Sequence, residues 1–451
     1  MNSLLEIGKK RTFKHGVHPK EFKSLSDDCV IERMPFVDEY TLHLSQHIGG
    51  GSKAIVKKGD KVKRGQKIAE ASGFVSVALH SPVDGIVSDI DIFLHPNGNM
   101  LPAIKIKTDA FSPQLLEDKN INLDEIDAPN FISQIQNAGI VGLGGAAFPT
   151  HVKFSIPKDK RCKYLMLNGC ECEPFLTADH RVMLEYSEAI IDGINVVNKY
   201  INAEKAYIGI EANKSDAILK LKSLAQKNEF PIEVIALEVK YPQGAEKMMI
   251  SAIMGDEIPS GKLPLDLGVV VSNVGTIVAV SDYFRKSQPL IERVVTVTGT
   301  AIKRPANILV PIGTPMREVI DLCGGIVGDV SRILLGGPMM GVVQKDLDVP
   351  VLKGTSGIVV LSDKEVLELD QFSCIRCSRC VDACPIFLNP SMMGLLAKKG
   401  LWDEMMDYNL MDCFECASCS YVCPSNIPLV QSFRVAKGMI REKSAREKNN
   451  K

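Results

Sequence analysis

The sequence predicts a multidomain protein of mixed α/β and α+β type. First, a length of 451 residues exceeds that of one ordinary domain. Second, the hydrophobic pattern changes along the chain, from short β-prone pieces to alternating strands and helices. Third, eight of the 13 cysteines lie between Cys374 and Cys423, which sets a C-terminal segment apart. We therefore expect domains at 1–120, 121–290, 291–360 and 361–440, followed by a basic tail at 441–451.

The composition limits the possible classes of function. Hydrophobic residues make up 45% of the chain and charged residues 24%, as in soluble globular proteins. A formal net charge of −1 argues against a nucleic-acid-binding protein, which normally carries a basic excess. The N-terminus lacks the apolar run of a signal peptide, and we find no stretch of about 18 apolar residues. We expect no nucleic-acid partner and no transmembrane segment.

The N-terminal domain, 1–120, reads as β-rich with frequent turns. Short β-prone pieces are separated by turn signals such as Gly59-Asp60 and Asp84-Gly85. The stretch 56–85 resembles the barrel-sandwich fold of lipoyl and biotinyl carriers. The carrier lysine is missing, because the tip region, 73–78, reads Gly-Phe-Val-Ser-Val-Ala. We therefore interpret this domain as a structural or docking module.

The central part of the chain, 121–290, alternates apolar strand-like runs with helical stretches. Such alternation predicts a largely parallel sheet covered by helices. The strands are expected near 164–167, 206–210, 232–236 and 269–271, and the helices near 181–197, 214–227 and 244–254.

The last two predicted domains differ in character. Residues 291–360 return to strand and turn patterns with a short helix near 316–322, and resemble the β-grasp (SLBB-like) module found beside flavin domains in respiratory enzymes. Residues 361–440 form a cysteine-rich, α-helical domain of ferredoxin-like type, with helical connections around 392–406. The polar tail, 441–451, is expected to fray.

Two cysteine runs carry the most specific signal in the chain. They read Cys374-x2-Cys377-x2-Cys380-x3-Cys384-Pro385 and Cys413-x2-Cys416-x2-Cys419-x3-Cys423-Pro424. In this spacing three thiolates wrap one four-iron cluster, and the fourth, before a proline, ligates the other cluster. We therefore predict two [4Fe–4S] clusters and single-electron transfer. The expected ligands are Cys374, Cys377, Cys380 and Cys423 for the first cluster and Cys413, Cys416, Cys419 and Cys384 for the second.

Two structural zinc sites are the alternative interpretation of these runs. Zinc favours paired Cys-x2-Cys hooks separated by a long gap, rather than a third cysteine two residues on and a final Cys-Pro. The other five cysteines are scattered, and the pair Cys170 and Cys172 has no partner pair that would complete a metal site.

A glycine-rich segment, 138–150, precedes His151-Val152-Lys153. Glycines let the backbone approach a phosphate or a planar ring, and a nearby lysine offsets phosphate charge. Alone the segment is ambiguous, because it lacks the spacing of a Rossmann fingerprint or a P-loop, and a structural turn is the alternative. The stretch 168–174 then gathers amide, thiol and carboxylate groups, although Glu171 and Glu173 within it are alternatively simple solvated side chains.

Four segments together resemble one known superfamily, the FMN- and NADH-binding subunit of respiratory complex I and its relatives. They are Gly142-x-Gly144-Gly145-Ala146-x-Phe148-Pro149-Thr150, then 168–174, then Tyr241-Pro242-Gln243-Gly244-Ala245-Glu246-Lys247, then Asn273-Val274-Gly275-Thr276. The N-terminal motif 13–19, the barrel-sandwich segment and the tandem cysteine runs narrow the resemblance. The chain is identified, over essentially its whole length, as similar to the RnfC family of the Rnf electron-transport complex.

This resemblance implies two sets of cofactor-binding residues. The first set would hold FMN, through the glycine loop, polar groups near the ring and groups near the phosphate: Gly142, Gly144, Gly145, Lys153, Asn168, Asn273 and Thr276. The second set would contact NAD(H), by stacking on the dinucleotide or orienting its nicotinamide or ribose: Phe148, Glu173 and Glu246. The chain departs from the complex I pattern at Leu143, Cys170 and Gly275, where arginine, aspartate and glutamate are common.

The resemblance also implies a function and a location. The chain would be a peripheral subunit at the cytoplasmic face of the cell membrane, within an ion-transporting ferredoxin–NAD⁺ oxidoreductase coupled to Na⁺ or H⁺ translocation. Its partners would be the other subunits of a membrane-embedded Rnf complex, including an iron–sulfur subunit that receives electrons from ferredoxin. No acid–base catalytic residue is predicted. The alternatives are a cobalamin reductase-like enzyme, whose flavin loop lies much nearer the N-terminus, and a non-enzymatic electron relay.

Overall fold

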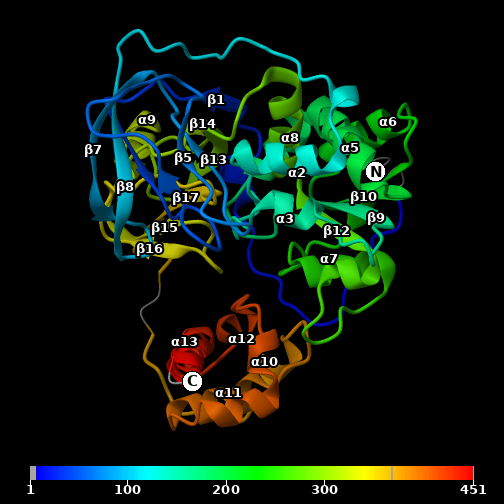
Figure 1. Ribbon diagram of the computed structural model, residues 1–451. Helices are drawn as coiled ribbons and strands as arrows, with labels where there is room; N and C mark the ends of the chain where they lie inside the picture. Colours follow the sequence, from blue (N-terminus) through cyan, green and yellow to red (C-terminus); the bar gives the residue numbers. More distant parts are fainter. Residues whose placement is uncertain (1–6, 367–368, 450–451) are drawn as a thin grey trace.

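The structure, a computed structural model, describes residues 7–366 and 369–449. The first six residues of the predicted N-terminal domain, residues 367–368 of the predicted cluster domain and residues 450–451 of the tail lie outside the described residues. Figure 1 shows a large body built from the N-terminal and central parts of the chain, with a smaller helical lobe from the C-terminal part below it. No helix in the described ranges is both long and apolar enough to cross a membrane.

The barrel-sandwich module consists of two small sheets, whose first strand begins at Glu39. Its two small sheets have the strand orders β2-β8-β7-β4 and β3-β5-β6. Their bounds are β2 (Glu39–His43), β3 (Lys53–Ala54), β4 (Lys61–Val62), β5 (Lys67–Glu70), β6 (Leu79–His80), β7 (Gly85–Leu94) and β8 (Met100–Thr108). The described segment before β2 pairs with the central and β-grasp modules. Arg11 and Val17 form bridges with Leu237 and Tyr241, and η1 (Lys23–Leu25) and β1 (Ile31–Arg33) follow.

The central module has a fully parallel sheet of order β11-β10-β9-β12. Its strands are β9 (Tyr164–Gly169), β10 (Lys205–Glu211), β11 (Ile232–Leu237) and β12 (Val269–Asn273). The helices are α2 (Ala128–Asn137), α3 (Thr150–Phe154), α4 (Ala178–Glu185), α5 (Ser187–Ile201), α6 (Ser215–Ala225), α7 (Glu246–Met254) and α8 (Val274–Lys286), with the short turns η2 (Leu123–Glu125) and η3 (Pro264–Leu267). The helix expected at 181–197 is two helices, because Tyr186 between them leaves the helical conformation.

The β-grasp module forms a mixed sheet of order β1-β14-β13-β17-β15-β16. Its strands are β13 (Glu292–Thr298), β14 (Ala306–Pro311), β15 (Val330–Leu335), β16 (Val342–Gln344) and β17 (Gly357–Ser362), and its helix α9 (Met316–Leu322) has the predicted bounds. The edge strand β1 pairs in parallel with β14, so a segment assigned to the N-terminal domain completes this sheet.

The lobe contains α10 (Arg379–Asp382), α11 (Pro390–Lys398), η4 (Asp403–Tyr408), η5 (Leu410–Asp412), α12 (Ser418–Tyr421) and α13 (Leu429–Asn449). The prediction of a frayed tail is wrong, since α13 continues across residue 440 as far as Asn449. Lysine, arginine, glutamate and alanine are good helix formers. Lys443 also pairs with Asp403 of η4 at 2.6 Å, which ties the helix to the rest of the lobe.

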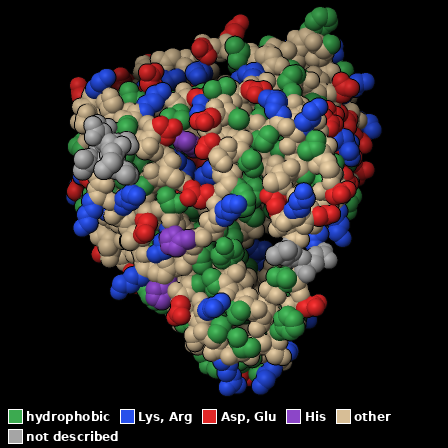
Figure 2. All heavy atoms as spheres, turned by 180° about the vertical axis from the view of Figure 1, so that it is seen from behind, with side chains coloured by type: hydrophobic (Ala, Val, Ile, Leu, Met, Phe, Trp, Pro, Cys, Tyr) green, Lys and Arg blue, Asp and Glu red, His purple; other side chains and the backbone are tan. Residues whose placement is uncertain are grey.

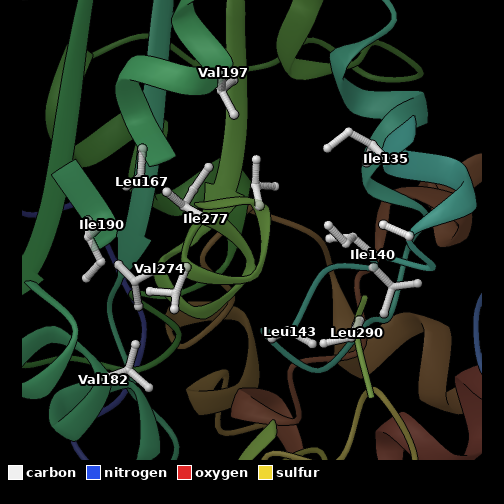
Figure 3. Packing of buried hydrophobic residues seen from close by; sticks show 14 of the residues in the cluster. Ile135, Ile140, Leu143, Leu167, Val182, Ile190, Val197, Val274, Ile277 and Leu290 are labelled. Carbon is white, nitrogen blue, oxygen red and sulfur yellow. The ribbon is translucent and has the colours of Figure 1, made fainter. Parts of the chain in front are cut away.

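The hydrophobic core joins the barrel-sandwich module to the central module. One continuous cluster of buried side chains includes Leu79 and Ile104 from the barrel and Phe131, Leu167 and Ile277 from the central module. Figure 3 shows the central part of this cluster, where Val274 and Ile277 of α8 lie close to Leu167 of β9. The barrel is thus packed in place by a shared core and is not a swinging carrier.

Candidate functional site: a cavity beside a cysteine-rich lobe

A cavity of about 860 Å³ lies where the predicted modules meet. The barrel contributes the loops 45–48 and 95–97, the central module contributes the glycine loop, and the β-grasp module contributes residues around Gly337. The lobe contributes Phe414, which follows the cysteine Cys413. Its size falls within the range of small-molecule sites, which favours a cofactor-binding role.

Every residue predicted to bind FMN or NAD(H) lines this cavity. The structure therefore brings together residues from segments more than a hundred positions apart. They are Gly142, Gly144, Gly145, Phe148, Lys153, Asn168, Glu173, Glu246, Asn273 and Thr276.

The glycine loop is held in one conformation by hydrogen bonds at both sides. The Gly142 amide donates to the Phe148 carbonyl at 2.8 Å, which closes the loop on itself. The Leu143 amide donates to the Thr276 hydroxyl at 2.9 Å. Gly145 has a φ of +104°, a backbone conformation that side chains rarely allow. The exposed glycine backbone at 144–145 thus presents a fixed surface to the cavity.

Asn273 caps the helix α8 at the edge of the cavity. Its side-chain oxygen accepts hydrogen bonds from the amides of Gly275 at 2.8 Å and Thr276 at 3.3 Å. A helix N-terminus with its positive end and free amides favours a negatively charged group. The Thr276 hydroxyl bonds the glycine loop, so Asn273 and Thr276 tie the start of α8 to this loop.

Two residues predicted to contact different cofactors pair with each other. The Lys153 ammonium group contacts the Glu246 carboxylate and also donates to the Val271 carbonyl at 3.2 Å. The Asn168 side chain donates to the Gly244 carbonyl at 2.7 Å, which fixes the turn before α7. Because the lysine and the glutamate are 27% and 40% exposed, both remain accessible to a ligand.

The carboxylates near this site are not simply solvated, so that alternative is wrong. Glu171 is buried and accepts hydrogen bonds from the amides of Asp179 and His180 at the start of α4. Glu173 accepts from the amides of Met339 and Met340 at 3.0 and 2.8 Å. Burial raises the pKa of Glu173 to about 7, against the opposing effect of these two amides. A Cβ at Gly337 would lie 2.3 Å from the Glu173 carboxylate, so only glycine fits there.

Two charged residues at the site were not predicted from the sequence, namely Asp179 in the cavity wall and Arg293, which bonds the glycine loop. Asp179 accepts a hydrogen bond from Asn273 at 2.7 Å, and burial with the nearby Glu171 raises its pKa to about 7. The buried Arg293 guanidinium donates to the carbonyls of Leu143 and Lys353. Neither residue belongs to a recognisable sequence motif. The one feature of the sequence that could have indicated them is a charged residue within a hydrophobic stretch.

The nearby thiols of two of the lobe cysteines, Cys380 and Cys413, agree with the predicted groups. Burial raises the pKa of Cys380, and the nearby thiols of Cys423, Cys374 and Cys377 raise it further. Burial likewise raises the pKa of Cys413 to about 11, with Cys416 and Cys384 as the neighbouring thiols. The crossed positions of Cys384 and Cys423 match the predicted exchange of the fourth ligand, and the ligation itself stays a prediction.

The described residues hold no group of three or more His, Cys, Asp or Glu side chains that converges on a single-ion site. A four-iron cluster takes each thiolate on a separate iron atom, so its ligands stand further apart than those of one zinc ion.

The second group of cysteines adjoins the cavity. Cys416 packs in one hydrophobic cluster with Tyr241 and Cys172, both of which line the cavity. Phe414, between Cys413 and Glu415, forms part of the cavity wall. The cluster predicted at Cys384, Cys413, Cys416 and Cys419 is thus the one beside the cavity.

The cavity wall fits a flavin by its own chemistry. The buried Thr150 hydroxyl lines it and has no hydrogen-bond partner among the described residues. Glycine backbone, the ammonium group of Lys153 and the amide of Asn168 surround an otherwise largely apolar space. Such a combination of flat apolar walls and a few convergent polar groups suits a planar ring with polar edges.

Comparisons with known families match each predicted module. Residues 11–110 match the RnfC barrel sandwich hybrid domain and residues 135–282 the Nuo51 FMN-binding domain. Residues 294–343 match the SLBB domain and residues 373–427 the 4Fe-4S dicluster domain. The predicted fold class and the FMN and iron–sulfur cofactors are confirmed, while the domain boundaries stay predictions.

Several relatives are similar over nearly the full length. The chain is 45% identical over 97% of its length to the C subunit of the proton-translocating ferredoxin:NAD(+) oxidoreductase complex of Clostridium ljungdahlii, covering 96% of that protein. It is 43% identical over 95% of its length to the C subunit of the Na(+)-translocating ferredoxin:NAD(+) oxidoreductase complex of Acetobacterium woodii, covering 97% of it. It is 41% identical over 97% of its length to the C subunit of the ion-translocating oxidoreductase complex of Rhodobacter capsulatus, covering 84% of it.

Among solved structures, an NAD+-reducing [NiFe]-hydrogenase in the H2-reduced state is similar with a TM-score of 0.50 and 18% identity. The match covers 68% of this chain and 61% of that chain. At this identity the likeness concerns the fold alone.

Proposed function

The chain belongs to the RnfC family, the C subunits of ion-translocating ferredoxin:NAD(+) oxidoreductase complexes, and from this premise we propose that it passes electrons between NAD(H), FMN and two [4Fe–4S] clusters. The observation that carries the proposal is the cavity, since its lining includes every predicted FMN and NAD(H) residue and also Phe414, which follows Cys413. FMN, when bound, exchanges electron pairs with a nicotinamide and single electrons with iron–sulfur clusters.

The residues of the chain would act by binding and positioning. The glycine backbone would lie against the flavin ring, and Lys153 and Asn168 would bond its polar groups. Asn273 and Thr276, with the N-terminus of α8, would hold the phosphate. Phe148 would stack on the dinucleotide, with Glu173 and Glu246 directed to its nicotinamide or ribose. None of these roles requires an acid–base catalyst in the chain.

The position of Phe414 supports an order of electron transfer. The thiols of Cys384, Cys413, Cys416 and Cys419 would hold the cluster that exchanges electrons with the cavity. The thiols of Cys374, Cys377, Cys380 and Cys423 would hold the cluster on the far side. Cys380, Cys384 and Cys419 pack in one hydrophobic cluster, which supports close spacing of the two iron–sulfur clusters.

In the assembled complex we place the chain at the cytoplasmic face of the cell membrane, bound to membrane-embedded subunits. An iron–sulfur subunit that receives electrons from ferredoxin would supply this chain. The relatives are named for proton or Na(+) translocation, and we propose ion coupling for the complex as a whole.

Anaerobic reconstitution with iron, sulfide and FMN tests this function. The reconstituted chain should hold FMN and two four-iron clusters and should oxidise NADH with an artificial electron acceptor. Uptake of clusters without flavin would leave only an electron relay. Flavin without NADH oxidation would remove the dehydrogenase function, and zinc in place of iron and sulfide would contradict the whole proposal.

A further inference from the structure

The two cysteine runs are related by an internal repeat. Each ligand of the second run lies 39 residues after its counterpart in the first. The backbone repeats as well, because Arg376 and Ser378 have positive φ values of 56° and 62°, and their counterparts Glu415 and Ala417 have 63° and 65°. Equivalent positions in the two loops can therefore be compared directly.

In the second loop the positions between the cysteines are used for contacts within the chain. Phe414 forms part of the cavity wall. Glu415 forms ion pairs with Arg434 and Lys437 of α13, each at 2.9 Å. This loop thus joins one cluster to the rest of the molecule, including the cavity with which it would exchange electrons.

In the first loop the same positions face solvent. Ile375, the counterpart of Phe414, is 68% exposed, and the nearby Phe372 is 62% exposed. Arg376, the counterpart of Glu415, and Arg379 are exposed and have no ion-pair partner among the described residues. We call the surface formed by Phe372, Ile375, Arg376, Cys377 and Arg379 the Cys377 rim.

The Cys377 rim has a fixed shape. The Phe372 amide donates to the Ser425 carbonyl at 2.9 Å, and the Ser425 hydroxyl donates to the Ser373 carbonyl at 3.0 Å. The segment before the first cysteine is therefore anchored against the chain that follows Cys423. On the face drawn in Figure 2, hydrophobic, Lys and Arg side chains share the surface of the lobe with Asp and Glu side chains.

We propose that the Cys377 rim is the surface through which an acidic iron–sulfur partner protein delivers single electrons to this chain. This inference rests on the proposed function and adds the docking surface to it. Cys377 itself is exposed, so its cluster would lie within reach of a partner's centre. Exposed apolar side chains beside two unpaired guanidinium groups favour a partner with an apolar patch and a carboxylate rim. Asp370 and Asp382 flank the segment in sequence, and the charged side chains of the rim itself are Arg376 and Arg379.

Each encounter would transfer one electron. The partner's iron–sulfur centre loses one electron, and the cluster held by Cys374, Cys377, Cys380 and Cys423 gains it. Two encounters supply the electron pair that, with one proton, converts NAD⁺ to NADH through the flavin.

Charge reversal at the rim tests the inference on the reconstituted chain. The probe is a purified acidic bacterial ferredoxin, reduced for rate measurements and oxidised for binding. Arg376→Glu with Arg379→Glu should lower the rate constant for electron transfer at low salt about tenfold or more, and should flatten its salt dependence. The dissociation constant should rise in parallel, while NADH oxidation with a small acceptor stays unchanged.

The matched control reverses two other exposed charges of the lobe, Lys398→Glu with Lys399→Glu at the end of α11, and so changes the net charge equally. If the arginine variant and the lysine variant slowed electron transfer equally, the change in net charge alone would explain the result, and the proposal would be overturned. An unchanged rate in the arginine variant, or no electron transfer from ferredoxin to the parent chain, would also overturn it. The rate of electron transfer from ferredoxin is followed by the absorbance of the clusters and does not depend on NADH oxidation. A failure of the proposed function would appear separately, as a loss of NADH oxidation in the parent chain. Iron and sulfide contents verify that both variants keep their clusters.

Discussion

The cavity and the lobe are built in opposite ways. The cavity takes its walls from distant segments of the chain, and its polar side chains are held by hydrogen bonds within the protein, such as those of Asn168 and Asn273. The lobe is one continuous segment whose small core includes two of the predicted ligand cysteines, Cys384 and Cys419, among its buried members. From this difference we predict that the cavity keeps its shape when FMN is removed, whereas the lobe depends on its metal for folding.

Removal of iron should therefore have the largest and most localised effect. In a small domain the free energy of metal binding is a large part of the free energy of folding. We expect the iron-free chain to be cleaved by protease between 369 and 449, while the body stays protected and binds FMN within about threefold of the parent affinity. Limited proteolysis with mass spectrometry checks this. If the iron-free lobe resisted the protease, or if the body lost FMN binding when the iron was removed, the proposed difference between the cavity and the lobe would be wrong.

Replacement of Lys153 tests the pre-formed cavity. Lys153→Met removes the ammonium group near Val271 and Glu246 and replaces it with an uncharged side chain. Since a hydrogen bond from a charged group contributes about 1.5–3 kcal/mol, FMN affinity should fall about tenfold to a hundredfold. Fluorescence titration of FMN measures it. Lys158→Met, at an exposed position four residues from the end of α3, is the matched control, and equal affinities in both variants would contradict the assignment.

The smallest expected effect concerns Glu173. Burial raises the pKa of its carboxyl from 4.5 to about 7, so the folded state binds this proton more tightly than the unfolded state. Ionisation therefore costs stability as the pH rises from about 4.5 to about 7, and the cost is constant above that. When the pH is raised from about 6 to about 8.5, the free energy of unfolding of Glu173→Gln should increase by about 1 kcal/mol relative to that of the parent chain.

Thermal unfolding of the FMN-free chain at the two pH values measures this difference. Glu229→Gln, at an exposed position, controls for the substitution itself. A stability difference for Glu173→Gln that does not change with pH would show that the carboxyl is not desolvated by the β-grasp module.

The sequence predicted best what is encoded by local spacing. The two cysteine runs predicted the 4Fe-4S dicluster domain, which the family comparison matches at 373–427, while the crossed grouping of the thiols stays a prediction. The strands of the central sheet and the helix α9 were also predicted, because hydrophobic periodicity marks them.

The sequence did not predict the features that depend on contacts between residues far apart in the chain. The edge strand β1 belongs to the β-grasp sheet through pairing with β14, which no local pattern reveals. The burial of Glu171 and Glu173 results from α4 and from the loop at 339–340, so their composition alone suggested solvated side chains. Phe414 could not be distinguished from a lobe core residue, because its contact with the cavity arises only when lobe and body pack.

The central claim is that the cavity exchanges electrons first with the cluster held by Cys384, Cys413, Cys416 and Cys419. Rapid anaerobic mixing with NADH tests it in Cys377→Ser and Cys416→Ser, each verified by iron and sulfide analysis to keep one intact cluster. In Cys377→Ser the remaining cluster should be reduced at the parent rate. In Cys416→Ser reduction of the remaining cluster should slow more than tenfold, while the flavin is reduced as before. Equal rates in the two variants, or the reverse order, would contradict the account.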